Sequence, residues 1–400
     1  MKKPLPQPKS ITDPAVPPII HVRRAPSWLF IVIALMLGLG FGWVVRGTTI
    51  TRGSQAVADL AGVKQILKDN FDGDIDGEKM SQGAVRGLVA SLGDPYTTFL
   101  DKTQSKALSD SLKGELSGIG IEIGLKNNRL TVISPLDGSP AAKAGLRSGD
   151  VIGLIGTEDT SEMTLDTAVD KIRGEKGTEV KLTILRGSDK PLELTIVRDT
   201  ITVSSVKYEV KPGGIGYIRL RQFGDDTDTA IRAATADLAK QGVTKIVLDL
   251  RDNPGGYLNS AVTVSSEFLD SGTVVEERSR HSESKTLVAN PGGALTKVKL
   301  IILVNGGSAS AAEIAAGALK DNGRATLVGE KTYGKGSVQE IKNLSDGNQL
   351  KVTVAHWYTP KGVNISKEGI APDVEVKNSS EDYNAGRDPQ LDKALELAAQ

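Results

Sequence analysis

Apolar residues are unevenly distributed along the chain, and the first apolar segment is also the longest. Ser27–Val45, SWLFIVIALMLGLGFGWVV, carries no charge, and at about 1.5 Å per residue a helix of this length crosses a hydrocarbon layer of ~30 Å. Basic residues outnumber acidic ones before it, which favours a cytoplasmic N-terminus. We therefore expect a disordered cytoplasmic tail at residues 1–24 and a single-pass anchor in the cytoplasmic membrane at residues 25–46, with the remaining chain outside the cytoplasm. A cleaved signal peptide is the alternative.

Residues 47–110 carry helical patterning that ends in SLGDPYTTFL, where glycine, aspartate and proline break the helix. Within this region, DGDIDGEKM begins like a calcium-binding loop. The position that should supply the bidentate glutamate is Gly83, however, so a turn in which Asp76 caps the next helix is the better interpretation. No metal site is expected.

Residues 111–200 switch to short alternating strands with two helices between them. The order is strand, strand, short helix, strand, helix, strand, and in GSPAAKAGLRSGD we expect Ser139 to cap the short helix and Pro140 to begin it. This order and this motif resemble a PDZ domain. Such domains bind a peptide as an additional strand and bind its terminal carboxylate with backbone amides. That loop would consist of Ser117, Gly118, Ile119 and Gly120. A small β-sandwich that uses these glycines only as turns is the alternative.

Residues 201–380 contain strands that are apolar throughout, alternating with helices. KIVLDLR at Lys245–Arg251, KLIILVN at Lys299–Asn305 and ATLVGE at Ala325–Glu330 are too apolar for a half-exposed sheet, so we expect parallel strands covered on both faces. Residues 310–320 would form a crossover helix, and residues 381–400 end in a helix capped by Asp388. The expected architecture is a multidomain α+β protein with an α/β core.

Composition narrows the chemistry. The 49 basic and 49 acidic residues cancel, so the overall charge gives no reason to expect nucleic acid as a partner. The absence of cysteine excludes disulfides, thiolate catalysis and cysteine-ligated zinc.

Candidate chemistry follows each apolar strand, where RDNPGGYL, GGSAS and KTYGKGSVQ come directly after the three strands. Ligands collect at the carboxyl ends of parallel strands. A serine on a sharp turn at a helix N-terminus can attack a carbonyl there, because nearby amides and the positive end of the helix dipole favour the oxyanion. The pattern therefore indicates acyl transfer.

The base that would activate such a serine is less evident. His21, His281 and His356 lie outside the convergent segments, so a Ser-His-Asp triad is open only through the last two. Lys335 lies between two glycines in the third segment, and in an extended chain Gln339 points to the same side. A lysine acts as a base only when neutral, which requires its pKa to fall from about 10.4 toward 7 or 8. A solvated surface lysine is the alternative.

The order of the motifs carries a wider resemblance. An anchor, a PDZ-like domain, LDLRDNPGG, NGGSASAAEI, VGEKTYGKGSVQ, TPKGVNISKEGIAPD and DPQLDKALEL together resemble the C-terminal processing peptidase, or tail-specific protease, family of serine proteases. The resemblance covers the chain from about Val57 to Ala399 and implies a core of the crotonase/Clp-protease type. It also implies that no cofactor is needed.

Site residues follow from the resemblance by position. It implies a nucleophile at Ser310, a general base at Lys335, an orienting amide at Gln339 and oxyanion-binding amides at Gly256 and Ala311. Ser308 would then be a cap. Asp249, Arg251 and Glu313 match supporting positions, and Arg173 matches an arginine implicated in coupling the PDZ domain to the protease site. Ala312 departs from the family's usual SASASE.

The predicted activity is that of a membrane-anchored serine endopeptidase that recognises unstructured C-terminal tails through its PDZ domain and forms an acyl-enzyme. A homodimer or an activating adaptor protein is left open. Two other functions remain as alternatives: a non-catalytic PDZ scaffold that binds protein C-termini, and a crotonase-like acyl-CoA enzyme.

Overall fold

The computed structural model describes residues 55–126, 129–136, 138–187, 190–379, 381–382 and 385–400, so the predicted tail and anchor lie outside the described residues. Among the residues that are described, no helix is both long and apolar enough to cross a bilayer. The chain divides into two compact units, Met1–Ser81 and Gln82–Gln400.

The first unit contains a helix over residues 55–70, followed by the acidic turn. Oδ1 of Asp76 accepts hydrogen bonds from the amides of Glu78 and Lys79, both at 3.0 Å. These two donors would otherwise be unpaired at the start of α2 (Gly77–Ala90). The prediction that Asp76 caps this helix is confirmed.

In the second unit, residues after α3 (Lys102–Leu112) form a small antiparallel sheet with its own hydrophobic core. Its strand order is β3-β4-β5-β7-β8, with β6 beside β5, and Ser139 caps the short α4 by accepting from the Ala142 amide at 3.2 Å. The elements are β3 (Ile121–Lys126), β4 (Arg129–Pro135), α4 (Pro140–Lys143), β5 (Val151–Ile155), β6 (Glu158–Asp159), α5 (Leu165–Ile172), β7 (Glu179–Leu185) and β8 (Leu192–Val197). The predicted strands and helices appear in the predicted order, and the structure adds β6 and β8, which were not predicted.

The larger core is built on a six-stranded sheet in which the three predicted apolar strands are adjacent and parallel. The sheet order is β10 (Val206–Lys211), β11 (Ile215–Leu220), β12 (Lys245–Asp249), β15 (Lys299–Val304), β16 (Ala325–Gly329) and β19 (Val374–Glu375). Only β10 runs antiparallel to its neighbour within this sheet.

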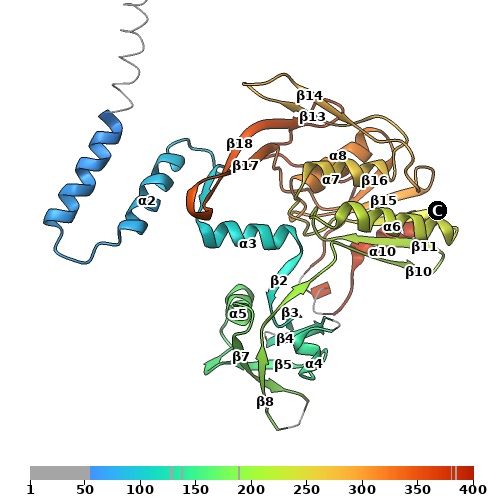
Figure 1. Ribbon diagram of the computed structural model, residues 1–400. Coiled ribbons are helices and arrows are strands. Elements are labelled where there is room, and N and C mark those ends of the chain that lie inside the picture. Colours follow the sequence, from blue (N-terminus) through green and yellow to red (C-terminus); the bar gives the residue numbers. More distant parts are fainter. Residues whose placement is uncertain (1–54, 127–128, 137, 188–189, 380, 383–384) are drawn as a thin grey trace, which may run out of the picture. The chain divides into compact units, whose positions relative to one another are not determined.

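Helices cover both faces of this sheet (Figure 1). Leu248 and Ile302 pack in one cluster with residues of α6 (Thr227–Lys240), α7 (Leu258–Ser266) and α8 (Ala311–Asp321). Val247 and Ile301, one position earlier, pack in another with α10 (Pro389–Ala399). Successive side chains of a strand point to opposite faces, so burial on both sides explains why these strands are apolar throughout.

A second sheet borders this core. It contains β1 (Thr98–Leu100), β18 (Gln349–Tyr358), β13 (Thr273–Arg278) and β14 (Lys285–Val288) in order, with β17 (Ser337–Asn343) also paired with β18. A turn of 3-10 helix, η1 (Ser345–Gly347), lies between β17 and β18. Separately, β2 (Glu115–Gly118) pairs with β9 (Asp199–Thr202). The loop from β16 to β17 holds Lys335.

Candidate active site

Ser310 lies on the sharp turn between β15 and α8, where it is the N-cap residue of the helix. Its backbone has φ 55° and ψ −116°, a conformation that costs a residue with a Cβ about 1–3 kcal/mol. The Ser310 amide donates to Glu313 Oε2 at 2.9 Å, which holds the turn in this conformation. Ser308 is buried, and its hydroxyl donates to the Leu250 carbonyl and accepts from the Asn305 amide. The prediction that Ser308 is a helix cap is therefore wrong.

Two backbone amides beside Ser310 have no hydrogen-bond acceptor among the described residues. Neither the Gly256 amide nor the Ala311 amide donates a hydrogen bond to any residue that the structure describes. Gly255, with φ 96°, lies so close to the turn that a Cβ there would be 2.7 Å from the Ser310 Cβ. Only glycine permits this close approach. The unpaired N–H groups of Gly256 and Ala311 therefore lie next to the serine.

Glu313 connects the serine turn to the lysine loop. Its carboxylate is fully buried, and Oε2 accepts from both the Ser310 amide and the Lys335 amide, each at 2.9 Å. Oε1 accepts from the Thr332 hydroxyl at 2.6 Å and the Gly334 amide at 2.7 Å. One carboxylate therefore fixes the backbone on both sides of the site, which gives this predicted supporting residue a structural role.

The Lys335 side chain is half-buried, and its amine forms no hydrogen bond or ion pair with the residues that the structure describes. Burial, together with the nearby charge of Lys351, lowers the pKa of Lys335 to about 8, although the charge of Glu313 opposes this shift. Nζ instead lies 5.4 Å from the centroid of the Tyr96 ring. A substantial fraction of this lysine is therefore neutral near pH 8.

Gln339 does not contact the lysine amine. Its Nε2 donates to Ser337 Oγ at 2.8 Å and to Thr353 Oγ1 at 3.3 Å. Likewise, no hydrogen bond between the described residues joins Lys335 Nζ to Ser310 Oγ. The structure thus holds the three side chains near one another without the contacts that a catalytic relay would need.

One cavity of about 490 Å³ brings these groups together. Its lining includes the three predicted side chains and the two residues with unpaired amides, namely Ser310, Lys335, Gln339, Gly256 and Ala311. The remaining lining is mostly apolar and includes Leu108, Leu112, Tyr257, Leu258, Ile314, Val338, Ile341 and Trp357. The arrangement offers a hydroxyl, a titratable amine and two N–H donors to a bound acyl group.

Asp249 and Arg251 lie outside this cavity, in a buried charge network. The guanidinium of Arg251 donates to Asp249 and to Asp388, at the start of α10. Burial alone would lower the pKa of Arg251, but the two carboxylates raise it well above its usual value. Burial likewise opposes ionisation of Asp249, whose pKa is nevertheless held low by Arg251 and Arg219. These residues join the sheet to the last helix.

The predicted carboxylate-binding segment, Ser117–Gly120, is only partly a loop. Ser117 and Gly118 lie in β2, paired with residues of β9, and the carbonyl of buried Ile119 accepts from the Ala141 amide. Gly120 has φ 76°. Arg173 is exposed at the end of α5, and its Cα would lie 3.7 Å from a Cβ on Gly118. The structure therefore places Arg173 beside this segment.

Sequence reasoning missed several contributors to the site. Tyr96 contacts the lysine amine, Lys351 lowers its pKa, and Leu108 and Leu112 of α3 line the cavity. Tyr96 belongs to the DPYTTFL segment, which was interpreted only as the end of a helix. Nothing in that segment's own composition indicates which distant residue it packs against.

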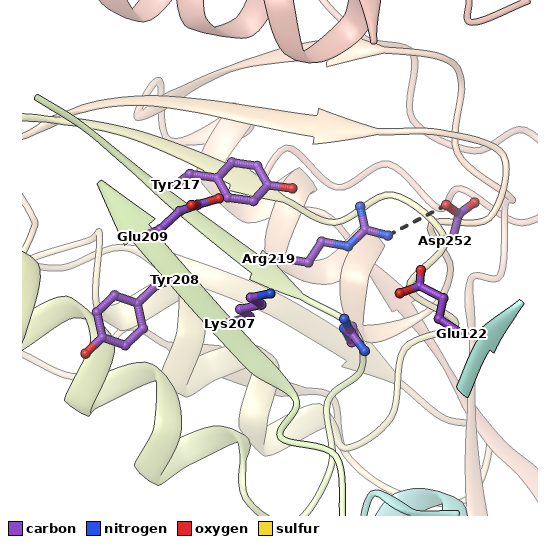
Figure 2. Close-up of a pocket in the computed structure, with 8 residues that line it drawn as sticks. Glu122, Lys207, Tyr208, Glu209, Tyr217, Arg219 and Asp252 are labelled. Atoms are coloured by element: carbon purple, nitrogen blue, oxygen red, sulfur yellow. Dashed lines mark ion pairs between the residues drawn. The ribbon is translucent and has the colours of Figure 1, made fainter. Parts of the chain in front are cut away.

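A second hollow, of about 480 Å³, lies over β10 and β11. Figure 2 shows Lys207, Tyr217 and Arg219 projecting into it, with Arg219 directed toward Asp252. None of the candidate catalytic side chains lines this hollow. It is a charged face of the sheet next to the Asp249 network rather than part of the cavity beside Ser310.

Comparisons with known proteins identify the family of the chain. Three family models match the chain: the activating protease CtpB N-terminal domain at residues 46–104, the PDZ domain at residues 107–185 and peptidase family S41 at residues 214–376. The carboxy-terminal-processing protease of Bartonella bacilliformis is 44% identical over 322 residues, covering 79% of this chain and 74% of its own. This chain belongs to peptidase family S41.

Two further relatives support the same placement. The carboxy-terminal processing protease CtpA of Bacillus subtilis is 38% identical over 312 residues, covering 78% of this chain and 67% of its own. A solved structure of the photosystem II D1 C-terminal processing protease is 31% identical with a TM-score of 0.52, covering 84% of this chain and 90% of that one. As an S41 peptidase, the protein is an enzyme, a serine protease of the carboxy-terminal-processing type, and it contains a PDZ domain.

Proposed function

We propose that the protein hydrolyses peptide bonds by a Ser-Lys dyad of Ser310 and Lys335. The observation that carries this proposal is the shared cavity, in which a strained serine, a lysine with a pKa of about 8 and two unpaired amides surround one space. A lysine with this pKa can act as a base near neutral pH, which an ordinary surface lysine cannot.

The chemistry proceeds in two halves. Neutral Lys335 takes the Ser310 proton as Oγ attacks the scissile carbonyl, and the Gly256 and Ala311 amides bind the oxyanion of the tetrahedral intermediate. Collapse of this intermediate breaks the C–N bond, and the lysine ammonium gives its proton to the leaving amine. Water then attacks the acyl-enzyme ester with the same lysine as base, which releases the new C-terminus and restores the serine.

Because Lys335 Nζ lies over Tyr96 and Gln339 donates elsewhere, both side chains must turn toward the serine before reaction. We propose that Gln339 then orients the amine, since a neutral amide adds no charge that would raise the lysine pKa. Conformational closure of this kind precedes chemistry in many enzymes.

Substrate recognition is proposed to begin at the PDZ domain, over residues 111–200. Its segment Ser117–Gly120 would bind the terminal carboxylate of an unstructured tail, with Arg173 close to it, while the core at residues 201–380 cleaves. We further propose that residues 25–46 anchor the protein in the cytoplasmic membrane with its catalytic region outside the cytoplasm, and that a second copy or an adaptor protein promotes the closed arrangement.

The decisive experiment measures cleavage of a protein with an unstructured C-terminal tail by the full chain and by Ser310→Ala and Lys335→Ala. Both variants should lose activity by about 10³-fold or more while retaining their thermal melting transitions. Lys331→Ala is the matched control, because Lys331 is an exposed lysine in the same loop. Cleavage that survives either substitution would refute the dyad, and tail binding without cleavage by the parent protein would identify a scaffold.

A further inference from the structure

The segment that contains Tyr96 is fastened to the hairpin beside the active site. The Thr97 hydroxyl donates to Asp94 Oδ2 at 2.6 Å and accepts from the Thr353 amide of β18 at 3.0 Å. Directly afterwards, β1 pairs with β18, with Thr98 opposite Lys351. The Tyr96 amide donates to Asp94 Oδ1 at 3.1 Å. Tyr96 is therefore held between two anchored positions, and its placement is not that of a free loop residue.

The Tyr96 ring meets the lysine amine at a distance where cation–π attraction operates. Lys335 Nζ lies 5.4 Å from the ring centroid, within the ~6 Å at which an ammonium is attracted to an aromatic face. Both side chains are half-buried, and removal of water strengthens such a contact. Tyr96 is not among the residues that line the cavity beside Ser310.

The other charged groups near the amine do not offer it a better partner. Glu313 of α8 attracts it, but that carboxylate already accepts four hydrogen bonds from the protein. Lys351 of β18 repels it. Burial raises the pKa of the Tyr96 phenol, and Tyr333, Glu313 and Asp94 raise it as well, so the phenol stays neutral while the lysine titrates.

We propose that Tyr96 is a positioning residue that binds the protonated form of Lys335 and holds the amine beside Ser310 rather than against it. This inference rests on the proposed dyad and adds the group that decides where the lysine side chain rests. A neutral amine gains little from the ring. Loss of the proton therefore releases the side chain toward the serine hydroxyl, and uptake of a proton returns it to the ring.

The sign of the effect on pH dependence follows directly. Cation–π attraction favours the charged lysine and raises its pKa, whereas burial lowers it. A leucine at position 96 keeps an apolar side chain over the amine but removes the π face. The lysine pKa should then fall, and protease activity should appear at lower pH.

The test measures kcat/KM for tail cleavage by the full-length protein between about pH 6 and 10. For the parent, activity should rise with pH, with a midpoint near the lysine pKa of about 8. In Tyr96→Leu the midpoint should fall by about one unit, so that the variant retains a roughly tenfold larger fraction of its plateau rate at low pH. Tyr96→Phe, which keeps the ring, should restore the parent midpoint.

Phe99→Leu is the matched control within the same segment, because the Phe99 ring lies 5.3 Å from Arg86 and does not contact Lys335. It should lower the melting temperature and leave the midpoint unchanged. An unchanged midpoint in Tyr96→Leu would overturn the proposal, and a raised one would show that the ring only excludes water. If the leucine variant does not fold, Tyr96→Met replaces it.

A second measurement separates this inference from the dyad itself. In the cleavage-deficient Ser310→Ala background, the ¹³Cε signal of Lys335 in lysine-labelled protein reports the lysine titration without any activity. Addition of Tyr96→Leu should lower this titration midpoint by about one unit as well. Persistent activity of Lys335→Ala would refute the dyad, whereas an NMR midpoint that does not move would refute the role of Tyr96.

Discussion

Two cations, one buried and one half-buried, follow strands of the same sheet, yet their surroundings shift their pKa values in opposite directions. Arg251, after β12, lies between the carboxylates of Asp249 and Asp388, and its pKa is raised. Lys335, after β16, has no carboxylate partner for its amine among the described residues, and its pKa falls to about 8. Burial disfavours the charged form of both. The available carboxylates therefore decide which cation is permanent and which can lose its proton.

Glu313 shows how this difference is maintained. Its negative charge acts on the Lys335 amine, but backbone amides of Ser310, Gly334 and Lys335 use its lone pairs. Asp249, by contrast, directs both oxygens at guanidinium groups. A carboxylate that binds backbone fixes geometry without fully compensating the neighbouring charge, which suits a site that needs a neutral amine.

The largest expected effect comes from giving position 335 a permanent cation like that of Arg251. Lys335→Arg keeps a long cationic side chain but replaces the amine by a guanidinium that stays protonated at every accessible pH. Tail cleavage should fall by about 10³-fold or more, because a general base is lost. Lys331→Arg, in the same loop, should cleave at the parent rate. Retention of more than a tenth of the parent kcat/KM by Lys335→Arg would contradict the assignment.

Much of the fold could be predicted because strands that are buried on both faces of a sheet have sequences that are apolar throughout. KIVLDLR, KLIILVN and ATLVGE became adjacent parallel strands, and the PDZ elements appeared in the predicted order. The antiparallel β10 and the second sheet around β18 were not predicted, since half-exposed strands mix polar and apolar residues. Pairing across hundreds of positions, such as Thr97 with Thr353, has no local signal.

The residues that form the candidate site could be predicted, but their hydrogen bonds could not. Convergence at strand ends predicted that the GGSAS and KTYGKGSVQ segments meet, and the family resemblance chose Ser310 within the first; Ser310 and Lys335 do line one cavity. Gln339 donates to Ser337 and Thr353. This choice depends on side-chain rotamers, which no sequence motif encodes. The prediction that Ser308 caps a helix was wrong. The sequence alone does not distinguish a serine that caps an Ala-rich helix from one whose hydroxyl holds the preceding turn in place.

A smaller effect, on the free energy of unfolding, is expected from removing the guanidinium of Arg251. Arg251→Met leaves Asp249, which is fully buried, with one guanidinium fewer and removes the contact to Asp388 at α10. Loss of one partner from a buried ion pair costs about 3–5 kcal/mol, and since Arg219 still contacts Asp249 at 2.8 Å we expect about 3 kcal/mol in chemical denaturation. Lys342→Met, which breaks an exposed pair with Glu340, should change stability by less than about 1 kcal/mol. Equal losses of stability in the two variants would show that the buried charge network stabilises the protein no more than an exposed ion pair does.

The smallest effect, and the sharpest contrast with Arg251, is that removing the second cation should stabilise the protein. Lys335 is charged in both the folded and unfolded chain below pH 8, so the folded state carries the full cost of burying the charge. Between pH 8 and its usual value of 10.5, the unfolded chain binds more protons, and stability of the parent rises with pH. Lys335→Met should therefore be about 1–3 kcal/mol more stable than the parent at pH 7, and this gain should vanish by about pH 10.5. Urea denaturation at both pH values measures it, with exposed Lys331→Met expected to show no gain at either. A gain that persists at high pH would come from better packing of methionine, and a loss at pH 7 would mean that the contacts of the charged amine, including the one with Tyr96, outweigh the cost of its burial.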